Sequence, residues 1–329
     1  MGHCYNHLTL EEREMIMVMY HENRSFSEIA RAIGRDKSTV SRELDRNHLW
    51  KRVYVANRAQ QMYEARRLLC RPHMRIEDEE IFNIVRACFL EHKWSPEQIS
   101  NRIALERPDL RVSTTTIYRA IYRHLLDYNP HQYGKGLAKK LRHKGKRRHG
   151  CNEEQKRGKI RISNELSERP AEANERTRLG DWEADTVIGK PGSSCAVTLV
   201  DRKSRYLLLG MSESKESEPV CNEIVDLLQG CPLQSVTPDR GKEFARHDKV
   251  TEELGVPFFF PLPHQPWQRG TNENTNGLLR EYMPKGCDMR GISESEMRWI
   301  QNELNTRPRK CLGYRTPHEV FFSESLHLI

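Results

Sequence analysis

The chain has 329 residues, of which 30% are charged and 36% hydrophobic. No run approaches the roughly 18 apolar residues of a membrane span, and the N-terminal sequence lacks the apolar core of a signal peptide. The nine cysteines form no CxxC pair and show no regular spacing, which argues against a zinc site or a disulfide framework and suits a reducing cytoplasm. We therefore expect a cytoplasmic protein of two or three domains with no membrane partner.

Charge is distributed unevenly along the chain. Residues 1–150 contain 29 Lys or Arg and 18 Asp or Glu, whereas residues 151–329 contain 25 and 28. A basic first half joined to a slightly acidic second half suggests a nucleic-acid-binding part followed by a part with another task. A solvated basic surface explains the charge equally well, so the motifs have to decide.

Residues 1–50 show the pattern of a helix-turn-helix domain. Thr9 and Glu12 are spaced as a capping box at the start of a first helix. A second helix fits 27–33, and Gly34 stands where a left-handed cap would end it. A helix, a short glycine-bearing turn and another helix are the order of a helix-turn-helix.

A third helix begins near Lys37 and turns Val40 and Leu44 inward. Its outward side chains are almost wholly hydrogen-bond donors, which favours DNA binding over an ordinary three-helix bundle. Such side chains can reach base edges and phosphates in a major groove. The candidate DNA-binding residues on this helix are Lys37, Ser38, Thr39, Ser41, Arg42 and Arg46.

A second, weaker helix-turn-helix pattern lies in the helical region 51–130. Residues 95–98 read Ser-Pro-Glu-Gln, a capping box with proline at the first helical position. The segment 106–112 breaks this helix, and Ser113 opens another. The outward residues of that helix, also candidates for DNA binding, are Thr114, Thr115, Tyr118 and Arg119.

Residues 131–172 are interpreted as a basic linker. Between 131 and 150 the chain has eight Lys or Arg and no acid, so nothing there can build a core. In a DNA-binding chain the same run can neutralise phosphates. Within it, the candidate DNA-binding residues are Lys146, Arg147 and Arg148.

From residue 173 to the C-terminus the pattern becomes that of an α/β domain. Short apolar runs alternate with helical segments, and two of the runs are joined as a hairpin. The expected order is three antiparallel strands, helix, strand, helix, strand and helices, which is the order of a ribonuclease-H-like fold. We therefore expect a mixed five-stranded sheet with strands near 183–188, 196–201, 206–211, 235–238 and 257–260.

Three acidic residues of this domain stand where metal ligands are plausible. Asp185 lies in the first strand, Asp239 follows the fourth, and Glu273 lies in the first turn of a late helix. Magnesium prefers oxygen ligands, usually one or two carboxylates together with substrate phosphates. Two such ions about 4 Å apart can stabilise both the attacking and the leaving oxygen of a phosphodiester exchange. We expect the three carboxylates to converge on two Mg²⁺ or Mn²⁺ ions.

Neighbouring acids offer alternatives. Glu183 shares a strand face with Asp185 and either assists it or is solvated. Asp201 is the best alternative ligand, but its place at the start of a turn favours a structural role. Glu243 lies near Asp239 and is interpreted as a cap or an ion-pair partner.

Several blocks of sequence together resemble the insertion-sequence-30 family of bacterial DDE transposases. They are FSEIARAIGRDKSTVSREL, WSPEQIS, GDWEADTVIG, LVDRKSRY, TPDRGKEF and HQPWQRGTNENTNGLLREYMPKG. The similarity covers nearly the whole chain. It implies an integrase-type, ribonuclease-H-like catalytic core with two metal ions. It also implies recognition of the terminal inverted repeats of a mobile element, followed by strand cleavage and strand transfer.

The resemblance also assigns roles to single residues. Asp185, Asp239 and Glu273 match the three acids of the family, and Arg280 matches the basic residue seven positions after the third acid. Seven residues are almost two helical turns, so Arg280 shares a face with Glu273 and suits a phosphate. The family usually has Asn after the second Asp, whereas this chain has Arg240.

The sequence therefore predicts a transposase that acts on double-stranded DNA, both element ends and target, as a homodimer or larger assembly in the bacterial nucleoid. One alternative is a catalytically inactive DNA-binding regulator derived from a transposase, and another is a metal-dependent nuclease without strand transfer. The predicted domains are 1–50, 51–130, the linker 131–172 and the catalytic domain 173–329.

Overall fold

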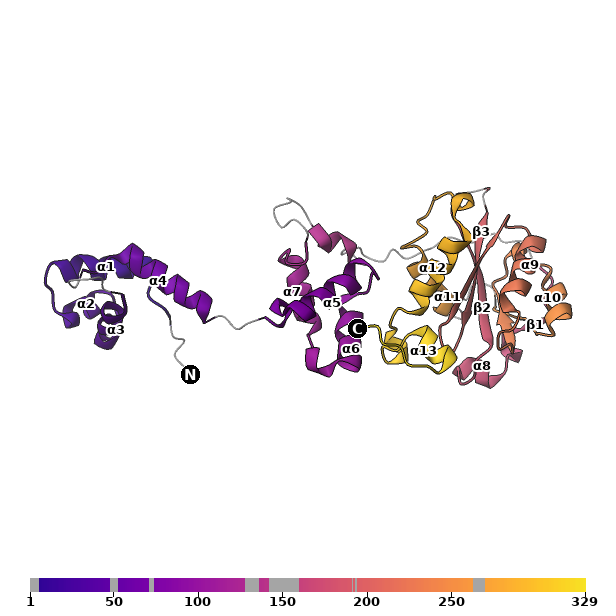
Figure 1. Cartoon of the computed structure of the whole chain (residues 1–329), viewed down its shortest axis with the longest axis horizontal. Coiled ribbons are helices and arrows are strands. Elements are labelled where there is room, and N and C mark those ends of the chain that lie inside the picture. Colours follow the sequence, from indigo (N-terminus) through magenta and orange to yellow (C-terminus); the bar gives the residue numbers. More distant parts are fainter. Residues whose placement is uncertain are drawn as a thin grey trace. The chain divides into compact units, whose positions relative to one another are not determined.

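The computed structural model describes most of the chain, and the statements below concern that part. Two compact units make up the chain, Met1–Met74 and Arg75–Ile329. Figure 1 shows the helices and strands of each. No helix in the described part is both long and apolar enough to cross a membrane. The described residues are 6–47, 53–70, 74–127, 136–141, 160–190, 192, 194–262 and 270–329.

The first unit is helical. Thr9 and Glu12 form the predicted capping box, and Ser25 and Glu28 form a second one. Gly34 has φ +66°, so the predicted left-handed residue after the second helix is confirmed. The helices of this unit are α1 (Leu10–His21), α2 (Phe26–Ala32), α3 (Lys37–Asn47) and α4 (Ala56–Leu69).

A buried polar contact fixes α3 against α1. Glu43 of α3 accepts hydrogen bonds from Arg13 Nε at 2.8 Å and from the Tyr54 hydroxyl at 3.0 Å. Burial and the neighbouring Glu43 raise the pKa of Tyr54 far above its ordinary value. Breaking a buried ion pair leaves an uncompensated charge. This contact therefore holds the outward face of α3 in one orientation relative to the small core.

The second unit begins with three helices and ends with an α/β sandwich. Ser95 forms the predicted capping box with Gln98, and Pro96 occupies the first turn. The helices are α5 (Glu79–Leu90), α6 (Pro96–Glu106), α7 (Thr114–Tyr122), α8 (Ala171–Glu175), α9 (Ser217–Leu228), α10 (His247–Leu254), α11 (Gly270–Leu279), α12 (Glu294–Asn305) and α13 (Pro317–Phe322). The strands are β1 (Asn164–Glu165), β2 (Asp181–Ile188), β3 (Cys195–Asp201), β4 (Leu207–Ser212), β5 (Ser235–Thr237) and β6 (Phe259–Phe260).

The main sheet is mixed and has the strand order β4-β3-β2-β5. β2 and β3 pair antiparallel, as do β3 and β4, whereas β2 and β5 pair parallel. Helices α9 and α10 cover one face, and α11 and α12 cover the other (Figure 1). Since strand side chains alternate, Val197 packs with Ile224 of α9 while Val200 packs with Leu278 of α11. The predicted class, helical units followed by an α/β core, is confirmed.

The prediction of a five-stranded sheet is wrong, because the main sheet has four strands among the described residues. The segment expected as the fifth strand, 257–260, meets β5 through the single bridge Val236–Phe258. Its last two residues form β6, which pairs parallel with β1 in a separate two-stranded sheet. Pro238 follows β5 and Pro261 follows β6. Neither proline has an N–H to donate, so the ladder cannot extend beyond them.

Helix α6 is docked onto the C-terminal part of the chain. The buried guanidinium of Arg102 donates to both carboxylate oxygens of Glu319, at 2.6 and 2.8 Å. Burial opposes ionisation of Glu319, but hydrogen bonds from Arg102 and from the backbone of Thr316 and Leu326 outweigh it and lower its pKa to about 2. The second helix-turn-helix region therefore belongs to the same compact unit as the α/β core.

Candidate active site and nucleic-acid interface

The first two candidate ligands lie on or just after two neighbouring strands, β2 and β5. In the parallel pair β2–β5, Glu183 is opposite Thr237. Asp185 and Asp239 each come two residues later, and successive residues of a strand alternate between its two faces. The paired register ends at Glu183 and Thr237, so each acid stands two residues beyond the last pair of these neighbouring strands. Asp239 is buried and Asp185 is half-buried.

Helix α11 runs alongside β2 and contacts it at two levels. The backbone N–H of Asn272 donates to Glu183 Oε2 at 3.2 Å. One helical turn later, Asn276 Nδ2 donates to Asp185 Oδ2 at 3.1 Å. Four helical residues and two strand residues both advance about 6 Å, so the helix follows the strand in step. Thr198 of β3 donates to Asn276 Oδ1 at 3.3 Å and completes the contact.

The third candidate ligand stands on this helix. Glu273 is exposed in the first turn of α11, three residues before Asn276, and positions three apart share a helix face. Arg280 follows on the same face and is half-buried, with Nη1 3.4 Å from the carbonyl of Met283. Within the described residues, no group of three His, Cys, Asp or Glu is close enough to hold a metal ion. Convergence of all three acids therefore stays a prediction.

The loop after β5 is shaped around two carboxylates. The N–H of Gly241 donates to Asp239 Oδ1 at 2.7 Å. A Cβ atom at Gly241 would lie 2.6 Å from that oxygen and 2.2 Å from Glu243 Oε2, so a larger residue would displace these carboxylates. Glu243 pairs with Lys215 at 2.9 Å, as an ion-pair role predicts, and accepts from Thr186 at 3.0 Å. Carboxylate oxygens are the ligands that a hard divalent ion prefers, so Asp239 fits such an ion, whereas Glu243 is already neutralised by Lys215.

The other two rival acids have structural partners. Glu183 is fully buried and pairs with Arg202, so the expectation that it might be solvated is wrong. Asp201 accepts hydrogen bonds from Ser204 N at 2.7 Å and Gly180 N at 2.9 Å. Burial raises the pKa of Asp201. The predicted structural role of Asp201 in the turn is confirmed.

Arg240, which replaces the Asn usual at this position, is turned toward another loop. Its Nε atom donates to the carbonyl of Pro261 at 2.6 Å. This contact ties the loop that follows β5 to the segment that follows β6. Arg240 therefore stabilises the arrangement of the two chain segments next to Asp239.

The candidate DNA-binding residues of α3 lie on its surface. Lys37, Ser38, Arg42 and Arg46 are exposed, and Thr39 and Ser41 are half-buried. Ser38 accepts a hydrogen bond from Arg42 at 2.9 Å. Asp45 is exposed on the same helix and lies 3.4 Å from the Ser41 hydroxyl, so the face contains one acid that the sequence interpretation did not weigh. The basic candidates Lys146, Arg147 and Arg148 lie outside the described residues.

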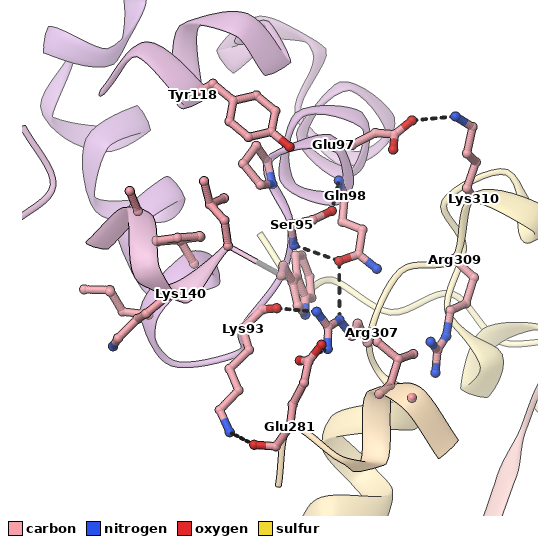
Figure 2. Close-up of a pocket in the computed structure, with 18 of the residues that line it drawn as sticks. Lys93, Ser95, Glu97, Gln98, Tyr118, Lys140, Glu281, Arg307, Arg309 and Lys310 are labelled. Carbon is pink, nitrogen blue, oxygen red and sulfur yellow. Dashed lines mark hydrogen bonds and ion pairs between the residues drawn. The ribbon is translucent and has the colours of Figure 1, made fainter. Parts of the chain in front are cut away.

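The candidates on α7 divide between two faces. Tyr118 lines a cleft of about 1900 Å³ whose lining also includes Asn274 of α11 and Arg280, which directly follows α11. Figure 2 shows Tyr118 in this cleft together with cationic side chains from the C-terminal segment. Thr115 and Arg119 are exposed on the remaining surface of α7, and Thr114 is half-buried. Sequence periodicity placed Tyr118 outward but gave no signal for the wall opposite it.

The fold defines a class, a protein with helical units followed by an α/β core around a mixed sheet. A helix-turn-helix domain model matches residues 4–47. The chain is 39% identical over 331 residues to transposase InsI for insertion sequence element IS30A of Escherichia coli, covering 95% of this chain and 83% of that protein. It is 38% identical over 324 residues to the transposase for insertion sequence element IS1086 of Cupriavidus metallidurans, covering 96% and 94%. The transposase for insertion sequence element IS4351 of Bacteroides fragilis is 37% identical over 329 residues, covering 96% and 95%.

Two solved structures are also similar. The catalytic core domain of BIV integrase is 19% identical with a TM-score of 0.35, covering 44% of this chain and 93% of that chain. A chain of the simian T-cell lymphotropic virus intasome in complex with PP2A regulatory subunit B56 gamma is 15% identical with a TM-score of 0.38, covering 71% and 76%. Because its sequence relatives are 37–39% identical over nearly the whole chain, the chain belongs to the insertion-sequence-30 (IS30) family of transposases. The resemblance noted from its motifs is confirmed.

Proposed function

We propose that the chain is an active transposase that binds the terminal inverted repeats of its insertion sequence, cuts DNA strands there and joins the freed 3′ ends to target DNA. The observation that carries the proposal is the hydrogen bond from Asn276 to Asp185, which ties α11, the helix that bears Glu273, to the strand that bears Asp185. The chain that contains this site belongs to a transposase family, and it also matches a helix-turn-helix domain model.

Asp185, Asp239 and Glu273 are the residues that would hold two Mg²⁺ or Mn²⁺ ions. When bound, the ions supply activation of the attacking oxygen and charge stabilisation of the leaving one. The chain prepares two of these ligands by hydrogen bonding. Thr186 N, at 2.8 Å, and Asn276 fix the carboxylate of Asp185, and Gly241 N fixes that of Asp239. The carboxylates act as ligands rather than as nucleophiles, so no covalent protein–DNA intermediate forms.

Arg280 is proposed to bind a phosphate near the cut. It shares the α11 face of Asn276, and Asn276 contacts Asp185. A guanidinium can donate two parallel hydrogen bonds to a phosphate. The charge of Arg280 would hold the backbone of the strand whose phosphate reacts at the carboxylates.

Recognition of the element end is assigned to the helix-turn-helix parts. Helix α3 would enter the major groove, where Arg and Lys reach base edges and phosphates. Lys146, Arg147 and Arg148 would neutralise phosphates of the same DNA. Holding two element ends needs at least two protomers, so the working assembly is a homodimer or larger.

The test uses a DNA duplex that carries the inverted repeat of the element, with Mg²⁺ or Mn²⁺. Cleavage, joining to a target duplex and binding are measured separately for the intact chain and for Asp185→Asn, Asp239→Asn and Glu273→Gln. The proposal expects each variant to bind the end normally and to cut and join nothing. An intact chain that binds without cutting is a regulator, and one that cuts without joining is a nuclease; either result overturns the proposal.

A further inference from the structure

The cleft between α7 and α11 carries an excess of positive charge. Its lining includes seven Lys or Arg and two Glu. Both acids are already paired with cations of the same cleft: Glu97 with Lys310 at 2.6 Å and Glu281 with Arg307 at 2.8 Å (Figure 2). The remaining lysines and arginines give the cleft a net positive charge. Such a surface fits an anionic polymer better than a neutral or cationic one.

Two aromatic rings stand on the α7 wall of this cleft. Tyr118 and Tyr122 are four residues apart and therefore share a helix face. Their rings are stacked, with centroids 6.4 Å apart and an interplanar angle of 17°. They are 36% and 62% exposed, whereas Ile117 and Ile121 on the other side of α7 are fully buried. The structure thus uses the aliphatic side of α7 for packing and leaves an aromatic pair facing the basic cleft.

Aromatic rings beside cations suit unpaired nucleotides. Proteins that bind single-stranded DNA combine a basic groove for the backbone with aromatic side chains on which bases stack. In an intact duplex each base is already stacked between its neighbours, so its face is not available to a tyrosine. The exposed rings therefore favour binding of an unpaired segment over a duplex. The cations alone would bind the phosphates of either form.

We propose that this cleft binds an unpaired segment of DNA, with bases on Tyr118 and Tyr122 and phosphates on Arg280, Lys139 and Lys140. Lys139 and Lys140 are exposed and line the cleft. Arg280 directly follows α11, the helix that contacts Asp185 through Asn276, so the bound segment would lie next to the strand that is cut. The inference rests on the proposed function, because cleavage of one strand at an element end is what frees unpaired nucleotides there.

Binding is measured by fluorescence anisotropy with a short labelled oligothymidylate and with a duplex of equal length, in EDTA so that no cut occurs. For the full chain with Tyr118→Ala and Tyr122→Ala together, we expect affinity for the single strand to fall by about 5- to 100-fold. Affinity for the duplex stays within about twofold. The matched Tyr118→Phe and Tyr122→Phe chain keeps the rings and binds both DNAs normally.

Unchanged single-strand affinity in the alanine variant overturns the proposal. An equal loss of affinity for the duplex also overturns it, because the tyrosines would then bind duplex DNA. Loss in the phenylalanine variant overturns it as well, because the hydroxyls rather than the rings would then bind. An oligonucleotide with 5-iododeoxyuridine locates the contact by photo-crosslinking, and crosslinks that avoid α7 also overturn it. Asp239→Asn separates the two proposals, since it removes cleavage if the proposed function is right and leaves oligothymidylate binding intact in either case.

Discussion

The two helices α3 and α7 arise from similar sequence patterns but have different surroundings. Helix α3 belongs to the small first unit and exposes Lys37, Arg42 and Arg46. Helix α7 belongs to the second unit, where Tyr118 lines a cleft shared with Arg280 of the α/β core. The difference fits the proposal that α3 serves recognition, whereas α7 is built into the unit that contains the candidate acids. A repeated motif need not have a repeated task.

The largest expected effect is confined to the second unit. Asp239→Asn should abolish detectable strand cleavage, a loss of at least the order of 10³-fold, the scale at which one preorganised electrostatic group contributes to catalysis. Binding of the element end should not change, because α3 is untouched. The control is Asp226→Asn, the same chemical change at an exposed position on α9. A loss of binding with Asp239→Asn would remove the distinction between the two units.

The docking of the second helix-turn-helix gives a similarly large effect on stability. Glu319→Ala leaves Arg102 with one carboxylate fewer in a buried site and should cost about 3–5 kcal/mol of the free energy of unfolding of the second unit. The first unit should unfold as before. Urea unfolding monitored separately for each unit measures both, with exposed Glu324→Ala as the control. Equal loss in both units would contradict their independence.

The same pair makes the second unit sensitive to acid. The pKa of Glu319 is lowered from 4.5 to about 2, by hydrogen bonds that outweigh burial. A depressed carboxyl pKa stabilises the folded state fully above the unfolded value, and this stabilisation is lost as the pH falls through the folded value. Stability should therefore decline between about pH 4.5 and 2. In Glu319→Gln this part of the decline should be absent, and a decline that persists unchanged would show that other groups cause it.

A smaller effect is expected on α3. Arg42→Ala should weaken binding to the element end by about 1–3 kcal/mol, roughly 5- to 150-fold in Kd. With saturating DNA, the cleavage rate of the variant should match that of the intact chain. Arg298→Ala removes an equally exposed arginine from α12 and should change neither quantity. An effect of Arg42→Ala on cleavage alone would assign α3 to catalysis rather than recognition.

Local patterns were enough to predict much of this fold. The capping residues Thr9 and Ser95 sit next to the helices that they start, and the hairpin β3–β4 follows from apolar runs on either side of a short turn. The fifth strand failed as a prediction because an apolar run does not tell whether its neighbour is long enough to pair. The signal that the prediction passed over is Pro238, which follows Thr237 and ends β5 after three residues.

The sequence predicted which residues belong to the candidate site but not which residues hold their side chains in place. Asp185 and Asp239 come from sequence blocks that resemble a family, and they lie on or just after the neighbouring strands β2 and β5. The hydrogen bond from Asn276 to Asp185 joins residues 91 positions apart, and no spacing rule anticipates it. Tyr122 was missed for a related reason. An exposed tyrosine is common on a helix surface. Its position becomes informative only because lysines and arginines from distant parts of the chain line the same cleft.

The most direct test compares Arg42→Ala and Asp185→Asn side by side on one DNA end. Equilibrium Kd and the single-turnover cleavage rate at saturating DNA are measured for both. The account predicts a crossed result: Arg42→Ala raises Kd and keeps the rate, while Asp185→Asn keeps Kd and abolishes cleavage. If each substitution changes both quantities together, recognition and chemistry are not divided between the first unit and the acids of the second, and the account is contradicted.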